Sequence, residues 1–271
     1  MKKSIKLAAI LLAGVLMLDS KYNITTTEYE IKSENLPVAF EDFHIVQISD
    51  LHGDMLSKNN EIIAEKIKAL NPDLIAITGD MADNMKNIHV FEILLRQLVG
   101  IAPIYFVNGN HEQGGLVAQQ VETLVESYGA EHLGNEYHPI YRKGERIIIA
   151  GVDDPMGRED MIKPDALVEK LRQDYPDEFT LLLGHRNYWV RDYYNLPVDL
   201  ILSGHAHGGI VRLPIIGGLF NVSHRLFADY EIGLYEGEQF TMCVNRGLGN
   251  SVPVPRMFNR PEIVSIKLRQ A

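Results

Sequence analysis

Apolar runs and stretches with helical spacing alternate along the first half of the chain. The apolar runs, which are typical of buried strands, occur at residues 45–48, 73–78 and 103–107. Apolar residues recur with helical spacing at 57–70, 88–99 and 116–128. This strand–helix repetition predicts a parallel sheet with right-handed crossover connections.

The second half predicts more antiparallel pairing. Two hairpins are expected, formed by residues 137–142 with 146–152 and by residues 231–235 with 239–245. Further strands are expected at 179–183, 198–202 and 263–268, and helices at 164–173 and 187–194. We therefore predict a mixed α/β (α+β) fold, a four-layer αββα sandwich in which two mixed β-sheets pack face to face and helices flank them.

The first residues carry a separate signal. Lys2, Lys3 and Lys6 precede or flank an apolar run, Leu7–Leu18, which has the length of a signal peptide and is short for a membrane span. We expect residues 1–20 to be a signal peptide or membrane anchor that leaves the rest of the chain outside the cytoplasm. A helix docked on the domain is disfavoured, because the run has no polar face.

The remaining chain is expected to form one domain. Residues 21–42 are expected to be an edge strand and a connector, and residues 43–271 have a length that suits a single α/β domain. The net charge of −10 disfavours nucleic acid as a partner, because nucleic-acid binders usually carry a basic surface. Cys243 is the only cysteine, which excludes an internal disulfide and a cysteine-based zinc site.

Five of the predicted strands end in residue types that ligate metals, each beside a glycine or a small residue. In chain order these residues are Asp50 with His52, Asp80, Asn110 with His111, His185, and His205 with His207. Strand ends of an open α/β sheet are where ligands bind, so these side chains are expected to form one site. Carboxylate and amide oxygens together with imidazole nitrogens suit divalent ions such as Zn, Mn and Fe.

Taken singly, these residues have structural explanations. Asp50 and Asp80 can be helix N-caps, and His52 can be a hydrogen-bonded histidine of the core. His205 and His207 are harder to explain in this way, because residues i and i+2 of a strand point to one side. The joint pattern favours a metal site.

The motifs together resemble the calcineurin-like metallophosphoesterase superfamily, whose signature is D-x-H, G-D, G-N-H-[DE], G-H and G-H-x-H. Every block is present in order, over roughly residues 43 to 268, as Asp50-Leu51-His52, Gly79-Asp80, Gly109-Asn110-His111-Glu112, Gly184-His185 and Gly204-His205-Ala206-His207. The resemblance implies a metallophosphoesterase domain at 43–271 and two bound divalent ions, with Mn, Zn and Fe as candidates.

The resemblance also implies a role for each motif residue. The first metal would be held by Asp50, His52 and His207, the second by Asn110, His185 and His205, and Asp80 would bridge both. Metal-bound hydroxide would attack the phosphorus of a phosphate ester. His111 would serve as general acid or charge stabiliser without ligating, and Glu112 would orient it through a hydrogen bond.

Three arginines are candidate substrate contacts, namely Arg186, Arg246 and Arg256. The stretch 245–263, the VQISDLHGD motif and the N-terminal apolar segment resemble a bacterial branch of membrane-associated phosphohydrolases, similar to UDP-2,3-diacylglucosamine hydrolase-like proteins. The branch implies a place on the extracytoplasmic side of the bacterial cell membrane, or export. One block departs from it, because Asn187 and not proline follows Arg186, so the lipid substrate is not carried over.

Three functions remain open at this point. The sequence is compatible with a hydrolase of phosphate esters, with a phosphodiester or pyrophosphate hydrolase acting on a nucleotide sugar or lipid head group, and with a catalytically inactive metal-binding scaffold. The presence of His111 favours an enzyme, because a scaffold has little use for a non-ligating histidine. The expected partners are a phosphorylated small molecule or lipid head group and the membrane surface, and a monomer is expected.

Overall fold

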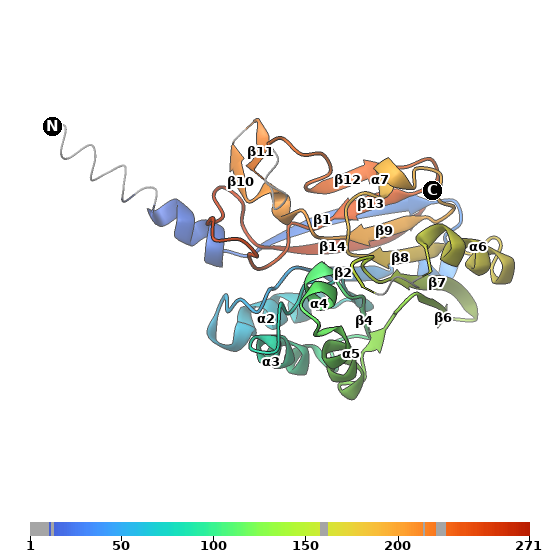
Figure 1. The fold of residues 1–271 in the computed structure, drawn as a ribbon. Helices are drawn as coiled ribbons and strands as arrows, with labels where there is room; N and C mark the ends of the chain where they lie inside the picture. The colour runs from blue at the N-terminus through green and yellow to red at the C-terminus, as the bar shows by residue number, and fades with distance from the viewer. Residues whose placement is uncertain (1–10, 12–13, 158–161, 214, 221–225) are drawn as a thin grey trace.

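Two six-stranded sheets form the centre of the computed structural model (Figure 1), which describes residues 11, 14–157, 162–213, 215–220 and 226–271. The first sheet runs, in spatial order, β1 (Thr25–Ser33), β14 (Glu262–Gln270), β2 (His44–Ile48), β3 (Leu74–Ile77), β4 (Ile104–Phe106) and β5 (Glu131–His132). The second runs β12 (Gly233–Glu236), β13 (Thr241–Val244), β9 (Leu200–Ser203), β8 (Thr180–Gly184), β7 (Glu145–Val152) and β6 (Glu136–Arg142). Both sheets combine parallel and antiparallel pairs.

Helices connect and cover the strands. The α-helices are α2 (Glu61–Leu70), α3 (Ile88–Leu98), α4 (Asn110–Gly114), α5 (Ala118–Ser127), α6 (Pro164–Asp174) and α7 (Trp189–Asp192). Three short 3-10 helices are η1 (Val38–Phe40), η2 (Lys58–Asn60) and η3 (His207–Gly209). A small antiparallel ribbon is formed by β10 (Val211–Leu213) and β11 (Gly217–Phe220).

Three buried clusters account for the layers. Ile45 and Ile266 of the first sheet share a cluster with Leu181 and Leu200 of the second, so the two sheets pack face to face. A second cluster joins the other face of the first sheet to α2, α3 and α5, and a third joins the second sheet to α6 and α7. The predicted sandwich of two mixed sheets flanked by helices is confirmed.

The sequence of β2 shows how one strand serves two layers. Ile45 contributes to the cluster between the sheets, whereas Val46 and Ile48 contribute to the cluster beneath the helices, as the period of two in a strand requires. Gln47 faces the second sheet, and its amide nitrogen donates to Thr78 Oγ1 and to the Ser203 carbonyl, each at 2.9 Å. The hydrogen bond to Ser203 joins the two sheets close to the strand ends that carry the site residues.

Most element predictions are confirmed, and the differences lie in short elements. The two hairpins are present as the antiparallel pairs β6–β7 and β12–β13, and β1 lies at the edge of the first sheet, parallel to β14. The ribbon β10–β11, the two-residue β5 and the single-turn α4 were not predicted. Elements this short carry too few residues to show a period.

The end of the N-terminal apolar run is a helix over residues 14–22 that contacts the domain. Asp19 forms an ion pair with Arg260 at 2.7 Å, and Ser20 is buried. Residues 7–10 and 12–13 of the run lie outside the described residues. In the part of the chain that the structure describes, no helix is both long enough and apolar enough to cross a bilayer.

The packing predicts that Ile45→Ala weakens the joint between the sheets. Ile45 is fully buried, so the loss of its side-chain atoms and the resulting cavity should lower the free energy of unfolding by about 2–5 kcal/mol. Urea unfolding in the presence of a chelator measures this without a contribution from bound metal. The control Val38→Ala, at a side chain that is 67% exposed, should change little, and equal effects of the two substitutions would contradict the packing described above.

Candidate metal centre

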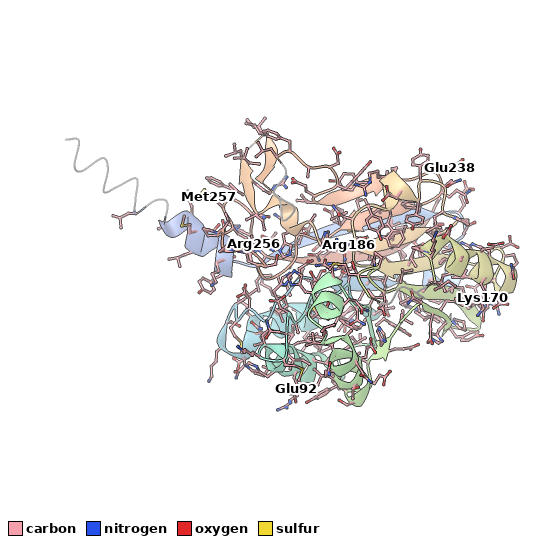
Figure 2. The ribbon with its side chains drawn as sticks, viewed as in Figure 1. Glu92, Lys170, Arg186, Glu238, Arg256 and Met257 are labelled. Carbon is pink, nitrogen blue, oxygen red and sulfur yellow. The ribbon has the colours of Figure 1, made fainter. Side chains whose placement is uncertain are left out.

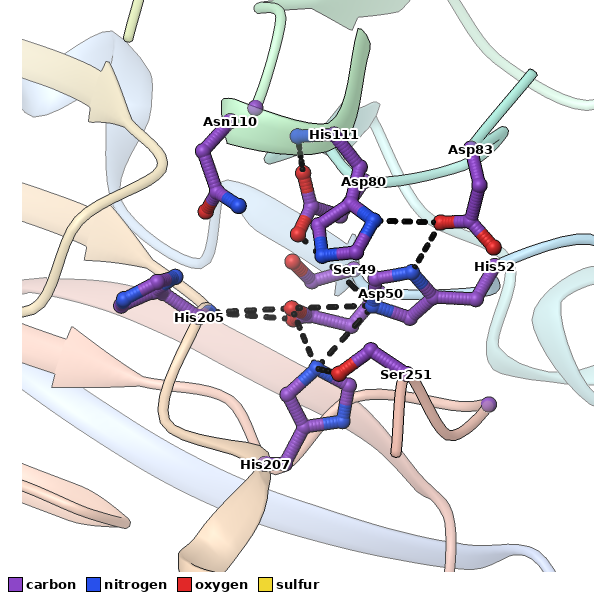
Figure 3. A network of polar contacts seen from close by, with 12 residues as sticks. Ser49, Asp50, His52, Asp80, Asp83, Asn110, His111, His205, His207 and Ser251 are labelled. Atoms are coloured by element: carbon purple, nitrogen blue, oxygen red, sulfur yellow. Dashed lines mark hydrogen bonds and ion pairs between the residues drawn. The ribbon is translucent and has the colours of Figure 1, made fainter. Parts of the chain in front are cut away.

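The carboxyl ends of β2, β3 and β4 meet those of β8 and β9 at one edge of the sandwich, where side chains that follow them contact one another. All seven residues expected to ligate metals lie there, together with His111 (Figure 3), namely Asp50, His52, Asp80, Asn110, His185, His205 and His207. They follow strands that are far apart in the sequence. His52 and His207, for example, are separated by 155 residues. The topology of the sheets is therefore what assembles the cluster.

Asp50, His52 and His207 form the first of two groups. His207 Nε2 lies 3.3 Å from Asp50 Oδ1 and 3.0 Å from His52 Nε2. One ligand atom from each residue lies within 4.8 Å of the others, which is the spacing that donors around a single ion require. All three side chains are almost fully buried.

Asp80, His185 and His205 form the second group, with Asn110 beside it. His185 Nε2 lies 3.1 Å from Asp80 Oδ2 and 3.1 Å from Asn110 Oδ1. The same Asp80 oxygen is 3.7 Å from His52 Nε2 of the first group. Asp80 thus stands between the two groups, with one oxygen facing a histidine of each.

The histidine tautomers fit a cation. His52 Nδ1 lies 2.6 Å from Asp83 Oδ1, and His185 Nδ1 lies 2.7 Å from the Thr78 carbonyl oxygen. Because both oxygens only accept, each neutral ring carries its proton on Nδ1 and presents the Nε2 lone pair to the cluster. The Nε2 lone pairs of His52 and His185 then converge with the oxygens of Asp50 and Asp80, so the residues present suit divalent ions.

Burial and charge oppose each other at the two carboxylates. Burial alone would raise the pKa of Asp50 and Asp80, but neighbouring imidazoles outweigh it and hold both pKa values below the ordinary range. In return, although burial lowers it, Asp80 and Asp50 raise the pKa of His185 to about 10. The raised pKa of His185 thus reflects the negative charge that a bound cation would compensate.

The backbone at the site is held in an unusual conformation. Five of the seven expected ligands have positive φ, at Asp50 (53°), His52 (51°), Asp80 (55°), His205 (67°) and His207 (50°). This region is uncommon for residues with a side chain, costs on the order of 1–3 kcal/mol each, and clusters at functional sites. The strain supports a functional use of these loops.

Gly204 is needed for the close approach of the loops. A Cβ atom at this position would come 2.0 Å from Ser49 Oγ and 2.4 Å from Asp50 Oδ2. The glycine therefore lets the turn after β9 lie directly on the turn after β2. This contact also allows the backbone N–H of His205 to donate to Asp50 Oδ1 at 3.1 Å.

The expected geometry of His205 and His207 is wrong, although both residues are in the cluster. β9 ends at Ser203, and His207 begins the 3-10 helix η3, so the pair is not part of a strand. With both residues at positive φ, the two rings enter different groups instead of pointing to one side. The directions of the two rings depend on consecutive backbone turns, and the spacing of residues in the sequence does not reveal such turns.

Asp83 is the residue that the sequence did not reveal. Its Oδ1 accepts from His52 Nδ1 at 2.6 Å and pairs with His111 Nδ1 at 2.8 Å, as the dashed lines in Figure 3 show. Asp83 therefore orients both a candidate ligand and the candidate acid. The only sign of Asp83 in the sequence is its place in the loop that begins with Asp80. No motif or regular residue spacing predicts its contact with His111.

Glu112 does not orient His111, contrary to the expectation. Its buried carboxylate instead accepts backbone N–H groups of Asp80, Met81, Ala82 and Gly109 at 2.6–3.0 Å. Burial, together with the charge of Asp80, raises the pKa of Glu112 to about 7. Glu112 shapes the Asp80 loop, while Asp83 holds the imidazole.

His111 lies close enough to His52 and Asp80 to share an ion with them, but it differs from the expected ligands in its exposure. Its side chain is 34% exposed, whereas those of His52, His185 and His207 are at most 2% exposed. Although burial opposes it, the hydrogen bond to Asp83 raises the pKa of His111 above its ordinary value. His111 is thus a proton-bearing group on the open side of the cluster.

The three arginines occupy different surroundings, and Figure 2 labels two of them. Arg186 pairs with Asp154 and places Nη1 3.0 Å from His205 Nε2, with 21% of its side chain exposed. Arg246 is paired with Glu262 at 2.8 Å. Arg256 is buried behind His207, with Nη2 3.2 Å from His207 Nδ1. Among these, Arg186 borders the cluster and retains exposed surface.

Comparison with known proteins extends along most of the chain. Residues 43–209 match the model of the calcineurin-like phosphoesterase family. The chain is 32% identical over 253 residues to YkuE, an uncharacterized metallophosphoesterase of Bacillus subtilis, covering 91% of this chain and 86% of that protein. It is 29% identical over 270 residues to an uncharacterized metallophosphoesterase of Aquifex aeolicus, covering 96% and 97%.

A solved structure supports the fold. The protein TT1561 of Thermus thermophilus superposes with a TM-score of 0.51 at 14% sequence identity, covering 76% of this chain and 89% of that one. The family match spans more than half of the chain and contains Asp50, Asp80, His111, His185 and His207 in the arrangement described above. The chain therefore belongs to the calcineurin-like phosphoesterase family of metal-dependent phosphoester hydrolases.

Proposed function

We propose that this chain hydrolyses phosphate esters with two divalent ions that share Asp80. The observation that carries the proposal is the position of Asp80 Oδ2, which faces His52 of the first group and His185 of the second. A carboxylate between two donor sets supports two ions at the separation of about 3.5–4 Å that two-metal hydrolases use. Mn, Zn and Fe all suit this donor set.

When bound, the two ions would lower the pKa of water towards about 7 and stabilise both the attacking and the leaving oxygen. The protein residues set the charge of the site. Asp50 and Asp80 contribute two negative charges, fewer than the positive charges of two divalent ions, so the site attracts a phosphate despite the net charge of −10. Arg186 lies at the border of the site, where its partly exposed guanidinium, held by Asp154, is the proposed contact for a phosphate oxygen.

His111 is the proposed general acid for the leaving oxygen. Asp83 accepts from Nδ1, which fixes the ring and leaves its other nitrogen free, and the exposed side of the ring faces solvent. The same Asp83 oxygen holds His52, so the position of the acid is coupled to the position of a ligand of the first metal. This arrangement gives His111 a role in an enzyme that an inactive scaffold would not need.

A second candidate function, hydrolysis of a phosphodiester or pyrophosphate with an apolar group, is favoured by a pocket beside the cluster. The pocket is lined mainly by apolar side chains from the helix at 14–22 and the loop at 248–256, including Leu18, Tyr22 and Val252, and by Leu56 from the loop after β2. Arg256, which contacts His207, forms part of its wall. We propose that a phosphate at the metals carries an apolar chain that extends past His207 and Arg256 into this pocket, as in a lipid head group.

The pocket also bears on where the enzyme works. Val15 and Leu18, on the helix at 14–22 that borders the pocket, and Leu11 before it are each at least 60% exposed. We propose that this helix lies at the outer surface of the bacterial cell membrane, where the apolar run that precedes it would be inserted. An amphiphilic phosphate ester would then reach the pocket from the membrane surface.

The shared carboxylate predicts that Asp80→Asn lowers metal content and turnover together. Loss of one negative charge weakens both donor groups, so we expect fewer ions per chain and a fall in kcat/KM of at least about a hundredfold. Metal analysis after dialysis and hydrolysis of para-nitrophenyl mono- and diesters, with Mn, Zn and Fe separately, measure both effects. Asp177→Asn, at an exposed aspartate, is the control, and retention of two ions and full turnover by Asp80→Asn would contradict the proposal.

The proposed role of His111 as general acid predicts that His111→Ala, unlike Asp80→Asn, lowers turnover without lowering metal content. We expect both ions to remain bound and kcat to fall by about 10²–10⁴-fold, because only proton transfer is removed. Asp83→Asn should lower kcat and also weaken metal binding, since it releases both His111 and His52. His138→Ala, at a histidine whose side chain is 43% exposed, is the control. Wild-type turnover in His111→Ala would remove His111 from the mechanism.

The pocket predicts a preference for long alkyl chains. Octyl para-nitrophenyl phosphate should have a kcat/KM at least about tenfold above that of the methyl diester, because burying two methylenes at about 0.8 kcal/mol each already gives that factor. Leu18→Asp should abolish the preference and leave the methyl diester unaffected. Val15→Asp, on the same helix but outside the pocket lining, is the matched control. Equal rates for the two diesters in the wild-type protein would exclude a substrate chain in this pocket.

A further inference from the structure

A second cluster of potential ligands lies apart from the dinuclear centre. It consists of Asn108 after β4, Glu122 on α5, His132 on β5 and Asp153 after β7. Ligand atoms of Glu122, His132 and Asp153 all lie within 4.8 Å of one another. The proposed mechanism uses none of these four residues.

The contacts inside this cluster are short and centre on two atoms. Asn108 Nδ2 lies 2.8 Å from Glu122 Oε1 and 3.1 Å from His132 Nε2. His132 Nε2 also lies 3.2 Å from Asp153 Oδ1. His132 Nε2 therefore has an amide donor on one side and a carboxylate acceptor on the other.

No assignment of protons satisfies these contacts when the carboxylates are ionised. If His132 carries a proton on Nε2, it donates to Asp153 but faces the Asn108 amide N–H groups. If it does not, its lone pair accepts from Asn108 but faces the Asp153 oxygen. Turning the Asn108 amide over, which exchanges its oxygen and nitrogen, places the oxygen against the Glu122 carboxylate instead.

Asn108 adds an independent observation. Its side chain is completely buried and lies against the cluster, yet Oδ1 has no hydrogen-bond partner. An unpaired buried polar atom costs about 1–3 kcal/mol. In the turned orientation the Asn108 oxygen becomes a fourth potential ligand atom, beside the atoms of Glu122, His132 and Asp153, and the amide nitrogen takes the buried position where Oδ1 has no partner.

We propose that Asn108, Glu122, His132 and Asp153 bind a third divalent cation, such as Zn²⁺. Ligand bonds of about 2.0–2.1 Å in a tetrahedral zinc site place neighbouring ligand atoms about 3.3 Å apart. The contacts of 2.8, 3.1 and 3.2 Å between neighbouring atoms are close to this spacing. A cation satisfies every acceptor at once and removes the conflict at His132.

The cation would have a structural effect on the catalytic centre. Asn108 is two residues before Asn110, and its backbone N–H donates to Asp153 Oδ1 at 3.0 Å. Asn108 and His132 follow or belong to strands of the first sheet, whereas Asp153 follows a strand of the second. The third ion would join the two sheets and fix the loop that carries Asn110 and His111.

Metal analysis of the intact protein tests this site. After saturation with Zn²⁺ and dialysis, Glu122→Gln should contain one ion per chain fewer than the wild-type protein, because a charged ligand is replaced by a neutral one of the same shape. Glu65→Gln, at an exposed glutamate of α2, is the control and should bind as many ions as the wild-type protein. Circular dichroism confirms that each variant is folded.

The same comparison in an Asp80→Asn background separates the third site from the dinuclear centre. Glu122→Gln should again remove one Zn²⁺, whatever Asp80→Asn has removed. Co²⁺ substitution gives a second measurement, since the tetrahedral absorption lost from Glu122→Gln should persist in Asp80→Asn. Equal zinc content in the wild-type protein and Glu122→Gln, in both backgrounds, would overturn the third site without affecting the proposed function.

Discussion

Asp50 and Asp80 lie in the protein interior, with 0% and 1% of their surface exposed. The negative charge of these two carboxylates is the constraint that the surrounding residues have to satisfy. Buried charges are costly unless they are compensated. Here the neighbours are imidazoles whose Nδ1 atoms are already used by Asp83 and Thr78, so their free lone pairs add to the demand for positive charge. Divalent ions meet that demand, and the same ions make the site attractive to phosphate.

The fold supplies the rigidity that this arrangement needs. The ligands stand on turns that follow fully buried strands, and several of these turns hold positive φ in residues other than glycine. Such strain persists because the surrounding contacts fix it: Gln47 joins the sheets, Glu112 gathers four backbone N–H groups, and Gly204 allows the turns to touch. The packing energy of the sandwich is therefore used in part to hold ligands in place.

The sequence indicated which residues would lie together at one edge of the sheets, but not how they are arranged there. Apolar runs and the motif residues that follow them led to the two-sheet fold, and the structure brings all the expected ligands together. The roles of Asp83 and Glu112 were not predictable, because a hydrogen bond between Asp83 and His111 depends on how two loops approach each other in space. The divergence of His205 and His207 depends on backbone turns, and the third cluster on four elements that meet only in the folded chain.

The sharing of Asp80 by two ions is the central claim, and anomalous diffraction from crystals of the Mn²⁺-loaded protein tests it most directly. We expect two anomalous peaks about 3.5–4 Å apart, one beside Asp50, His52 and His207 and the other beside Asn110, His185 and His205, with the Asp80 carboxylate between them. A single peak at this edge of the sandwich, or two peaks of which only one contacts Asp80, would contradict it.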